Sequence, residues 1–126
     1  IRPDAVIHTA AMANPESCQL DPQGAYAINV GATTAIARCC QERDIPLVFT
    51  STDIVFDGLH APYGESDPVS PVNIYGEQKA LAEEKIQALD SKATICRLPL
   101  MFGRPSPAAA RFGEPLIRAI TSSMLA

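Results

Sequence analysis

Tyr75 and Lys79, which stand four residues apart, are the side chains of this sequence best suited to acid-base chemistry. On a helix, residues at this spacing share one face, so a phenol and an ammonium would lie close together. A free tyrosine, with a pKa of about 10, is a poor acid-base group at neutral pH, and a nearby ammonium favours its ionised form. During reduction of a ketone, Tyr75 would donate the proton to the carbonyl oxygen and Lys79 would activate it.

Three hydroxyl residues in a row, Thr50, Ser51 and Thr52, end a strand-like segment upstream of this pair. Thr52 would hydrogen-bond the same carbonyl oxygen during the reaction. Simpler interpretations remain open for all of these residues. Tyr75 would then be an amphipathic surface or interface residue, Lys79 a solvated helix charge, and the hydroxyls would cap the strand end or form a local turn.

Hydrophobic patterning predicts alternating strands and helices around these residues. Strands are expected over 5–9, 46–51 and 93–98, and the first of them suits a strand buried on both faces. Helices are expected over 21–43 and 72–89, because Asp21-Pro22 and Ser70-Pro71 each place a capping residue before a proline. A loop is expected after the first strand, a longer loop over 53–70, and a weaker helix over 114–123.

The order strand, helix, strand, helix, strand predicts an α/β fold with a mostly parallel sheet and right-handed crossovers. In such a sheet, ligands bind beyond the carboxyl ends of the strands. Polar residues follow all three predicted strands, within 8–11, 50–53 and 97–103. The sequence therefore predicts a ligand crevice formed by these three segments, toward which Tyr75 and Lys79 would point.

Composition restricts the partners that we expect. The net charge is −4, and the 10 lysines and arginines form no run, which argues against nucleic acid and anionic membranes as partners. No apolar stretch approaches the roughly 20 residues needed to span a bilayer, and the first residues lack a signal-peptide pattern. We therefore expect a cytoplasmic protein with a small-molecule partner. The scattered acids of 53–67 are interpreted as turn formers, and no metal site is assigned.

Taken together, several motifs resemble the extended short-chain dehydrogenase/reductase superfamily, and most closely its dTDP-4-dehydrorhamnose reductase branch. The motifs are Tyr75-x-x-x-Lys79 and the segments 5–11, 21–31, 51–58, 71–76 and 97–103. The resemblance implies a Rossmann-like, doubly wound sheet and NADPH or NADH as cofactor. It further implies reduction of the 4-keto group of a nucleotide-linked deoxysugar.

The same resemblance implies a role for individual residues. Thr52 would polarise the carbonyl, Tyr75 would donate the proton, and Lys79 would activate Tyr75 and hold the cofactor's ribose. Asn29 would support the site from its helix. The implied cofactor-binding residues lie at strand ends and on the second helix, and they are Ala10, Ala11, Ser51, Tyr75, Lys79 and Pro99.

Two departures from the family pattern bear on these expectations. The glycine-rich phosphate-binding motif is absent from this sequence, and Ile54 stands where many members of the branch have tyrosine. We therefore expect residues 1–126 to be the central and C-terminal portion of one NAD(P)-binding domain, with the substrate-binding part starting after about residue 99. Such a fragment is expected to be inactive alone.

Other functions within this family pattern stay open. A nucleotide-sugar epimerase or dehydratase uses the same tyrosine and lysine with a tightly held NAD. A non-catalytic regulatory subunit, similar to that of methionine adenosyltransferase, shares the Ser-Thr-Asp and Tyr-Lys motifs. The family also pairs helices of this kind into dimers, so a homodimer is expected.

Overall fold

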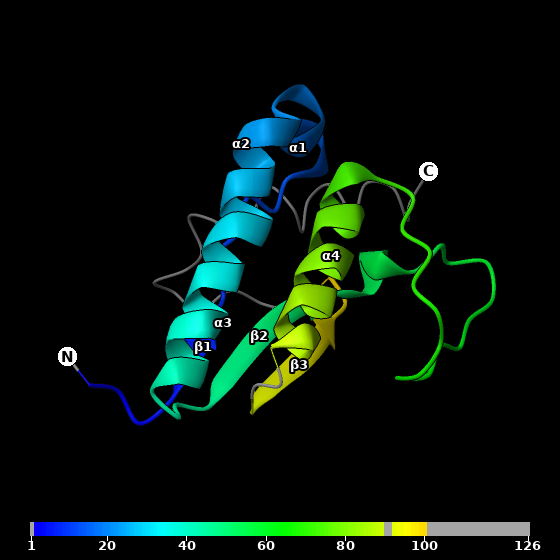
Figure 1. The fold of residues 1–126 in the computed structure, drawn as a ribbon. Coiled ribbons are helices and arrows are strands. Elements are labelled where there is room, and N and C mark those ends of the chain that lie inside the picture. The colour runs from blue at the N-terminus through cyan, green and yellow to red at the C-terminus, as the bar shows by residue number, and fades with distance from the viewer. Residues whose placement is uncertain (1, 90–91, 101–126) are drawn as a thin grey trace, which may run out of the picture.

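The computed structural model describes residues 2–89 and 92–100 of the chain, and Figure 1 shows their arrangement. The elements, in order, are β1 (Val6–His8), α1 (Pro15–Leu20), α2 (Pro22–Tyr26), the π-helical segment η1 (Ala27–Ala32), α3 (Thr33–Glu42), β2 (Leu47–Thr52), the 3-10 turn η2 (Asp53–Val55), α4 (Ile74–Ala88) and β3 (Ala93–Leu98). None of the helices described is both long enough and apolar enough to cross a membrane.

The three strands form one parallel sheet in the order β1-β2-β3. Val6 is paired with Leu47, which is in turn paired with Ala93. Because each strand is added on the same side of the last, right-handed crossovers place both helical connections on one face of the sheet, as Figure 1 shows. This arrangement confirms the expected α/β fold with a parallel sheet.

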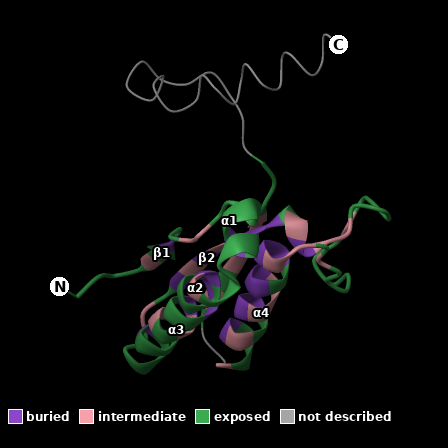
Figure 2. Ribbon diagram, turned by 90° about the horizontal axis from the view of Figure 1, so that it is seen from above, coloured by how far each residue is buried: buried purple, intermediate pink, exposed green. Residues whose placement is uncertain are grey.

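The core lies between β2 and the two long helical connections. Leu47 and Phe49 are almost fully buried against residues of α3 and α4, and the other core members are Ala37, Cys40, Ala82 and Ile86. In Figure 2, α4 carries buried residues along much of its length. The strand alternation thus directs Leu47, Phe49 and Ser51 toward the helices, and this places Ser51 under the helix that carries Tyr75.

Several expected elements match the structure. β3 has the predicted bounds, and β2 differs by one residue at each end. The predicted helix over 21–43 is present as the continuous run α2-η1-α3, although the π-helical turn inside it was not expected. The weaker helix over 114–123 lies outside the described residues.

Three expectations were wrong. β1 is not buried on both faces, because Ile7 is 69% exposed on the face opposite the helices. Residues 15–20 form helix α1 rather than a loop, since the Asn14 side chain accepts a hydrogen bond from Ser17 N at 2.9 Å. The cap of α4 is Asn73 instead of Ser70, and its side chain accepts a hydrogen bond from the Gly76 N–H.

Candidate active site

The carboxyl end of β2 runs directly into the turn η2, and Thr52 makes the junction. Its Oγ1 accepts a hydrogen bond from Ile54 N at 3.2 Å and lies 3.2 Å from Asp53 Oδ1. Both Thr52 and its neighbour Ser51 are buried. The Ser51 Oγ atom has no hydrogen-bond partner among the described residues. A buried hydroxyl without a partner is uncommon in a folded protein and marks this strand end as a place for a polar ligand.

Gly76 brings the start of α4 against this turn. A Cβ atom at Gly76 would lie 2.5 Å from the Ile54 carbonyl oxygen, closer than real Cβ contacts allow. The absence of a side chain therefore lets the first turn of α4 rest directly on η2. Because Tyr75 precedes Gly76, this close approach also brings Tyr75 to the residues that follow Thr52.

Tyr75 is 9% exposed and packs in a small cluster with Cys18 and Ala25. Burial raises its pKa, and Cys18 and Asp53 raise the pKa further. Lys79 is not among the groups that shift it, so the expected lowering of the Tyr75 pKa by an adjacent ammonium is not present in this arrangement. The phenol is thus protonated at neutral pH, which is the form that can donate a proton.

Lys79 is 3% exposed and its side chain extends toward β2. Its Nζ donates a hydrogen bond to the Thr50 carbonyl oxygen at 2.5 Å and lies 4.2 Å from the centroid of the Phe49 ring. Burial lowers the pKa of Lys79 to about 8, while the Glu83 carboxylate acts in the opposite direction. Lys79 is therefore an ammonium that loses its proton far more readily than a solvated lysine.

The structure thus brings all three predicted catalytic residues to the carboxyl end of β2, but they contact different parts of it. Tyr75 adjoins the turn that Thr52 begins, whereas Lys79 lies against the strand itself. No hydrogen bond joins any two of Thr52, Tyr75 and Lys79 in the described part of the chain.

The predicted cofactor-binding residues Ala10 and Ala11 follow β1, where Ala10 is exposed and Ala11 is half-buried. The backbone of the next residue, Met12, is held by Asn29, which is buried in η1. The Asn29 side chain accepts a hydrogen bond from Met12 N at 2.8 Å and donates to Met12 O at 3.1 Å. Pro99 is exposed, one residue beyond β3. Small side chains and a clamped backbone leave room for a ligand to approach the end of β1.

Gln78 is a site residue that the sequence did not indicate. Its Oε1 accepts a hydrogen bond from Asn29 Nδ2 at 2.9 Å, and its Nε2 donates to the Pro22 carbonyl at 3.0 Å. Gln78 thereby joins α4 to the helical run that clamps Met12. The only sequence signal for Gln78 was its place between Tyr75 and Lys79 on the predicted helix. A polar residue next to predicted site residues can face the site instead of solvent.

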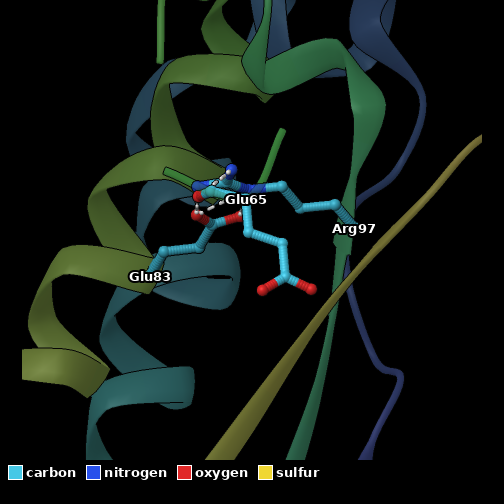
Figure 3. Close-up of polar contacts among 3 residues, drawn as sticks. All are labelled: Glu65, Glu83 and Arg97. Carbon is cyan, nitrogen blue, oxygen red and sulfur yellow. Dashed lines mark hydrogen bonds and ion pairs between the residues drawn. The ribbon is translucent and has the colours of Figure 1, made fainter. Parts of the chain in front are cut away.

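Arg97 and Glu83 form a second polar centre, with Glu83 one helical turn beyond Lys79 on α4, and Figure 3 shows the pair. Arg97 Nη2 lies 2.7 Å from Glu83 Oε2, and Nε also donates to this carboxylate. Nη1 donates to the Glu65 backbone carbonyl at 3.4 Å, and the guanidinium lies 5.0 Å from the Phe56 ring centroid. The bidentate pair ties β3 to α4 and to the 56–65 loop.

A cleft of about 900 Å³ opens beside this pair. Its lining includes Asp53, Phe56, Glu83 and Arg97, but not Thr52, Tyr75 or Lys79. Asp53 directly follows Thr52, so the cleft reaches the turn at the end of β2 without containing the three predicted catalytic residues. The polar groups at the strand ends, rather than this cleft, define the candidate site.

Comparisons with known proteins identify the family of this chain. The family model described as RmlD substrate binding domain matches residues 1–120. Methionine adenosyltransferase 2 subunit beta of Rattus norvegicus is 33% identical over 102 residues, covering 81% of this chain and 30% of the relative. The dTDP-4-keto-6-deoxy-D-glucose reductase of Streptomyces niveus is 35% identical over 105 residues, covering 82% of this chain and 36% of the relative.

Among solved structures, dTDP-4-dehydrorhamnose reductase of Bacillus anthracis, in complex with NADP, superposes with a TM-score of 0.75 at 30% identity. The match covers 90% of this chain and 42% of that structure. The chain thus spans about a third of the length of the curated relatives.

Proposed function

Because the chain belongs to the RmlD substrate binding domain family, we propose that the protein reduces the 4-keto group of a nucleotide-linked deoxysugar with NADPH or NADH. The observation that carries the proposal is the meeting of Thr52, Tyr75 and Lys79 at the carboxyl end of β2, beside an unpartnered buried hydroxyl. The reductase of Streptomyces niveus and the NADP complex from Bacillus anthracis support the substrate class and the cofactor.

The described residues fit a nicotinamide cofactor in their chemistry. Ala10 and Ala11 present little bulk at the end of β1, and Ser51 offers a buried hydroxyl that no described residue uses. An ammonium has three donors, and Lys79 has one hydrogen-bond acceptor among the described residues, so it can also donate to ribose hydroxyls. When bound, the cofactor supplies hydride to the carbonyl carbon.

Each catalytic residue then has one task. Tyr75 donates its proton to the carbonyl oxygen, and burial keeps the phenol protonated until that step. Thr52 donates a hydrogen bond to the same oxygen and so stabilises the negative charge that develops on it. Lys79 holds the ribose through the donors of its ammonium. We further propose that the substrate-binding part begins after about residue 99.

The test is a reduction assay on the intact protein with a dTDP-4-keto-6-deoxysugar. We expect one NADPH or NADH to be oxidised for each sugar reduced, with exchangeable cofactor. Failure to reduce any nucleotide-linked 4-keto sugar would contradict the proposal. A cofactor that stays bound through purification, with interconversion of sugar epimers and no net oxidation, would indicate an epimerase or dehydratase instead.

A regulatory role is the second candidate, because the rat methionine adenosyltransferase subunit beta is similar over most of this chain. In that role, the intact protein would form a stable complex with a synthetase and would reduce no keto sugar. Size-exclusion chromatography with the candidate synthetase, run beside the reduction assay, distinguishes the two functions.

A further inference from the structure

Phe49 has an unusual position in the core, because its ring lies against both the Lys79 ammonium and the His8 ring. The Phe49 ring is fully buried, with Lys79 Nζ 4.2 Å from its centroid and the His8 ring stacked 5.8 Å away. His8 is held in turn by a 2.9 Å hydrogen bond between its Nε2 and Thr33 Oγ1. A buried aromatic ring with fixed neighbours is a rigid platform for an ammonium.

The platform acts together with the backbone of β2. Thr50 follows Phe49, and its carbonyl oxygen accepts a hydrogen bond from Lys79 Nζ at 2.5 Å. The ring face and the carbonyl oxygen both present negative charge to the ammonium, and together they compensate part of its desolvation. Ser51 and Thr52 come next on the strand, so the ammonium is fixed beside the residues proposed to contact cofactor and substrate.

We propose that Phe49 is a positioning residue for Lys79, holding the ammonium charged and oriented at the carboxyl end of β2 through its ring face. This inference rests on the proposed function, because it takes Lys79 to be the residue that holds the ribose. It goes further by assigning a role in the reaction to an apolar core residue that touches neither substrate nor cofactor.

The charged groups around Lys79 leave this role to the ring. On β1, His8 is kept neutral, since burial and the Lys79 charge both lower its pKa. On α4, Glu83 attracts Lys79, but its carboxylate is engaged by Arg97 from β3 at 2.7 Å. Among the described residues, Lys79 has no ion-pair partner of its own. Glu83 therefore supports the Lys79 charge without pairing with it, and the groups closest to the ammonium are the Thr50 carbonyl and the Phe49 ring.

The experiment reduces the negative electrostatic potential of the Phe49 ring face while keeping the shape of the side chain. Phe49 is replaced in the intact protein by phenylalanines with one, two or three ring fluorines, and the Lys79 pKa is followed by NMR with labelled lysine. The chain has three lysines, so Lys79→Arg assigns the signal. A cation–ring contact of about 0.7 to 1.4 kcal/mol predicts that the Lys79 pKa falls stepwise by about 0.5 to 1 unit across the series.

Phe56 provides the matched control, because its ring lies against the Arg97 guanidinium rather than Lys79. The same fluorination at Phe56 should leave the Lys79 pKa unchanged. Phe49→Met, which keeps most of the volume but removes the ring, should lower the pKa at least as far as the trifluorinated ring. An unchanged Lys79 pKa in the Phe49 series, or an equal shift in both series, would overturn the inference.

The pH dependence of the rate then separates positioning from simple packing. The alkaline limb of the kcat/KM profile should move to lower pH by the same amount as the Lys79 pKa in each Phe49 variant. A profile that stays fixed while the Lys79 pKa moves would also overturn the positioning role. An intact protein without reductase activity would instead refute the proposed function, and the pKa series would still report whether the ring holds the ammonium.

Discussion

Lys79 and Arg97 both lie over phenylalanine rings, but their electrostatic surroundings differ. Arg97 is paired with the Glu83 carboxylate at 2.7 Å, and this hydrogen bond raises its pKa. Lys79 has a carbonyl oxygen and a ring instead of a paired carboxylate, and burial lowers its pKa to about 8. One cation is locked in its charged form, whereas the other can titrate.

This difference separates a structural cation from one suited to chemistry. A buried cation whose charge is matched by a carboxylate fixes the elements that it joins, and its proton is not available. A buried cation held by neutral groups is costly to keep charged, so its position has to be explained by function. Neighbouring turns of α4 thus carry a proposed catalytic residue, Lys79, and one member of a structural pair, Glu83.

Removing the Arg97 guanidinium should have the largest effect on stability. Arg97→Met leaves the buried Glu83 carboxylate without its cation, and we expect a loss of about 3 kcal/mol in the free energy of unfolding. Urea denaturation measures this loss. Lys92→Met is the control, because Lys92 and Asp44 form an exposed pair that should contribute less than about 1 kcal/mol. Equal losses of unfolding free energy in both variants would contradict the claim that the buried pair contributes more to stability than the exposed pair.

The difference in the pH dependence of stability between the protein and Lys79→Met should report Lys79, whereas the raised pKa values of Cys18, Cys40 and Tyr75 affect both proteins alike. Since the Lys79 pKa is lowered from 10.5 to about 8 on folding, the unfolded chain binds more protons at Lys79 between these values, and the Lys79 contribution to stability should rise with pH across this window. We expect a gain on the order of 2 kcal/mol relative to Lys79→Met. Urea titrations at pH 7 and pH 10 measure it. The stability difference between the protein and Arg97→Met should not change between pH 7 and pH 10. If the stability difference between the protein and Lys79→Met also stays constant over this range, Lys79 is not desolvated.

Adding a methyl group at Gly76 should have a smaller effect on stability. Gly76→Ala places a Cβ 2.5 Å from the Ile54 carbonyl oxygen, and the clash should cost about 1 to 2 kcal/mol after the better helix propensity of alanine is included. Gly31→Ala is the control, because its nearest contact would be an ordinary 3.8 Å. Equal stability of both variants would contradict the close approach.

Sequence patterns predicted the elements of this molecule better than the contacts between them. β3 was predicted residue for residue, because a short apolar run has one natural interpretation between a helix and a proline. The cap of α4 was misplaced at Ser70. Ser70 and Asn73 are both suitable capping residues, and the path of the preceding loop, which the sequence does not reveal, decides between them. Helix α1 was missed although Asn14 and Pro15 provide the same cap-and-proline signal that identified α2.

For the site, too, the sequence predicted individual residues better than the contacts between them. Thr52, Tyr75 and Lys79 were predicted as site residues from their types and spacing, because helix periodicity places Tyr75 and Lys79 on one face and Thr52 ends a strand. The Lys79 contacts with Phe49 and Thr50 could not be found, since they join residues 29 or 30 positions apart through the packing of α4 on β2. The raised pKa of Tyr75 likewise depends on burial among Cys18 and Ala25, which spacing does not reveal.

The central claim is that Tyr75 donates the proton, and single-turnover reduction by Tyr75→Phe in the intact protein tests it most directly. We expect the rate of keto-sugar reduction to fall by about 10²- to 10⁴-fold while cofactor affinity is unchanged. Tyr26→Phe, which removes the hydroxyl of a tyrosine that is 45% exposed, should keep the normal rate. A Tyr75→Phe protein that reduces the sugar at the normal rate would contradict this role.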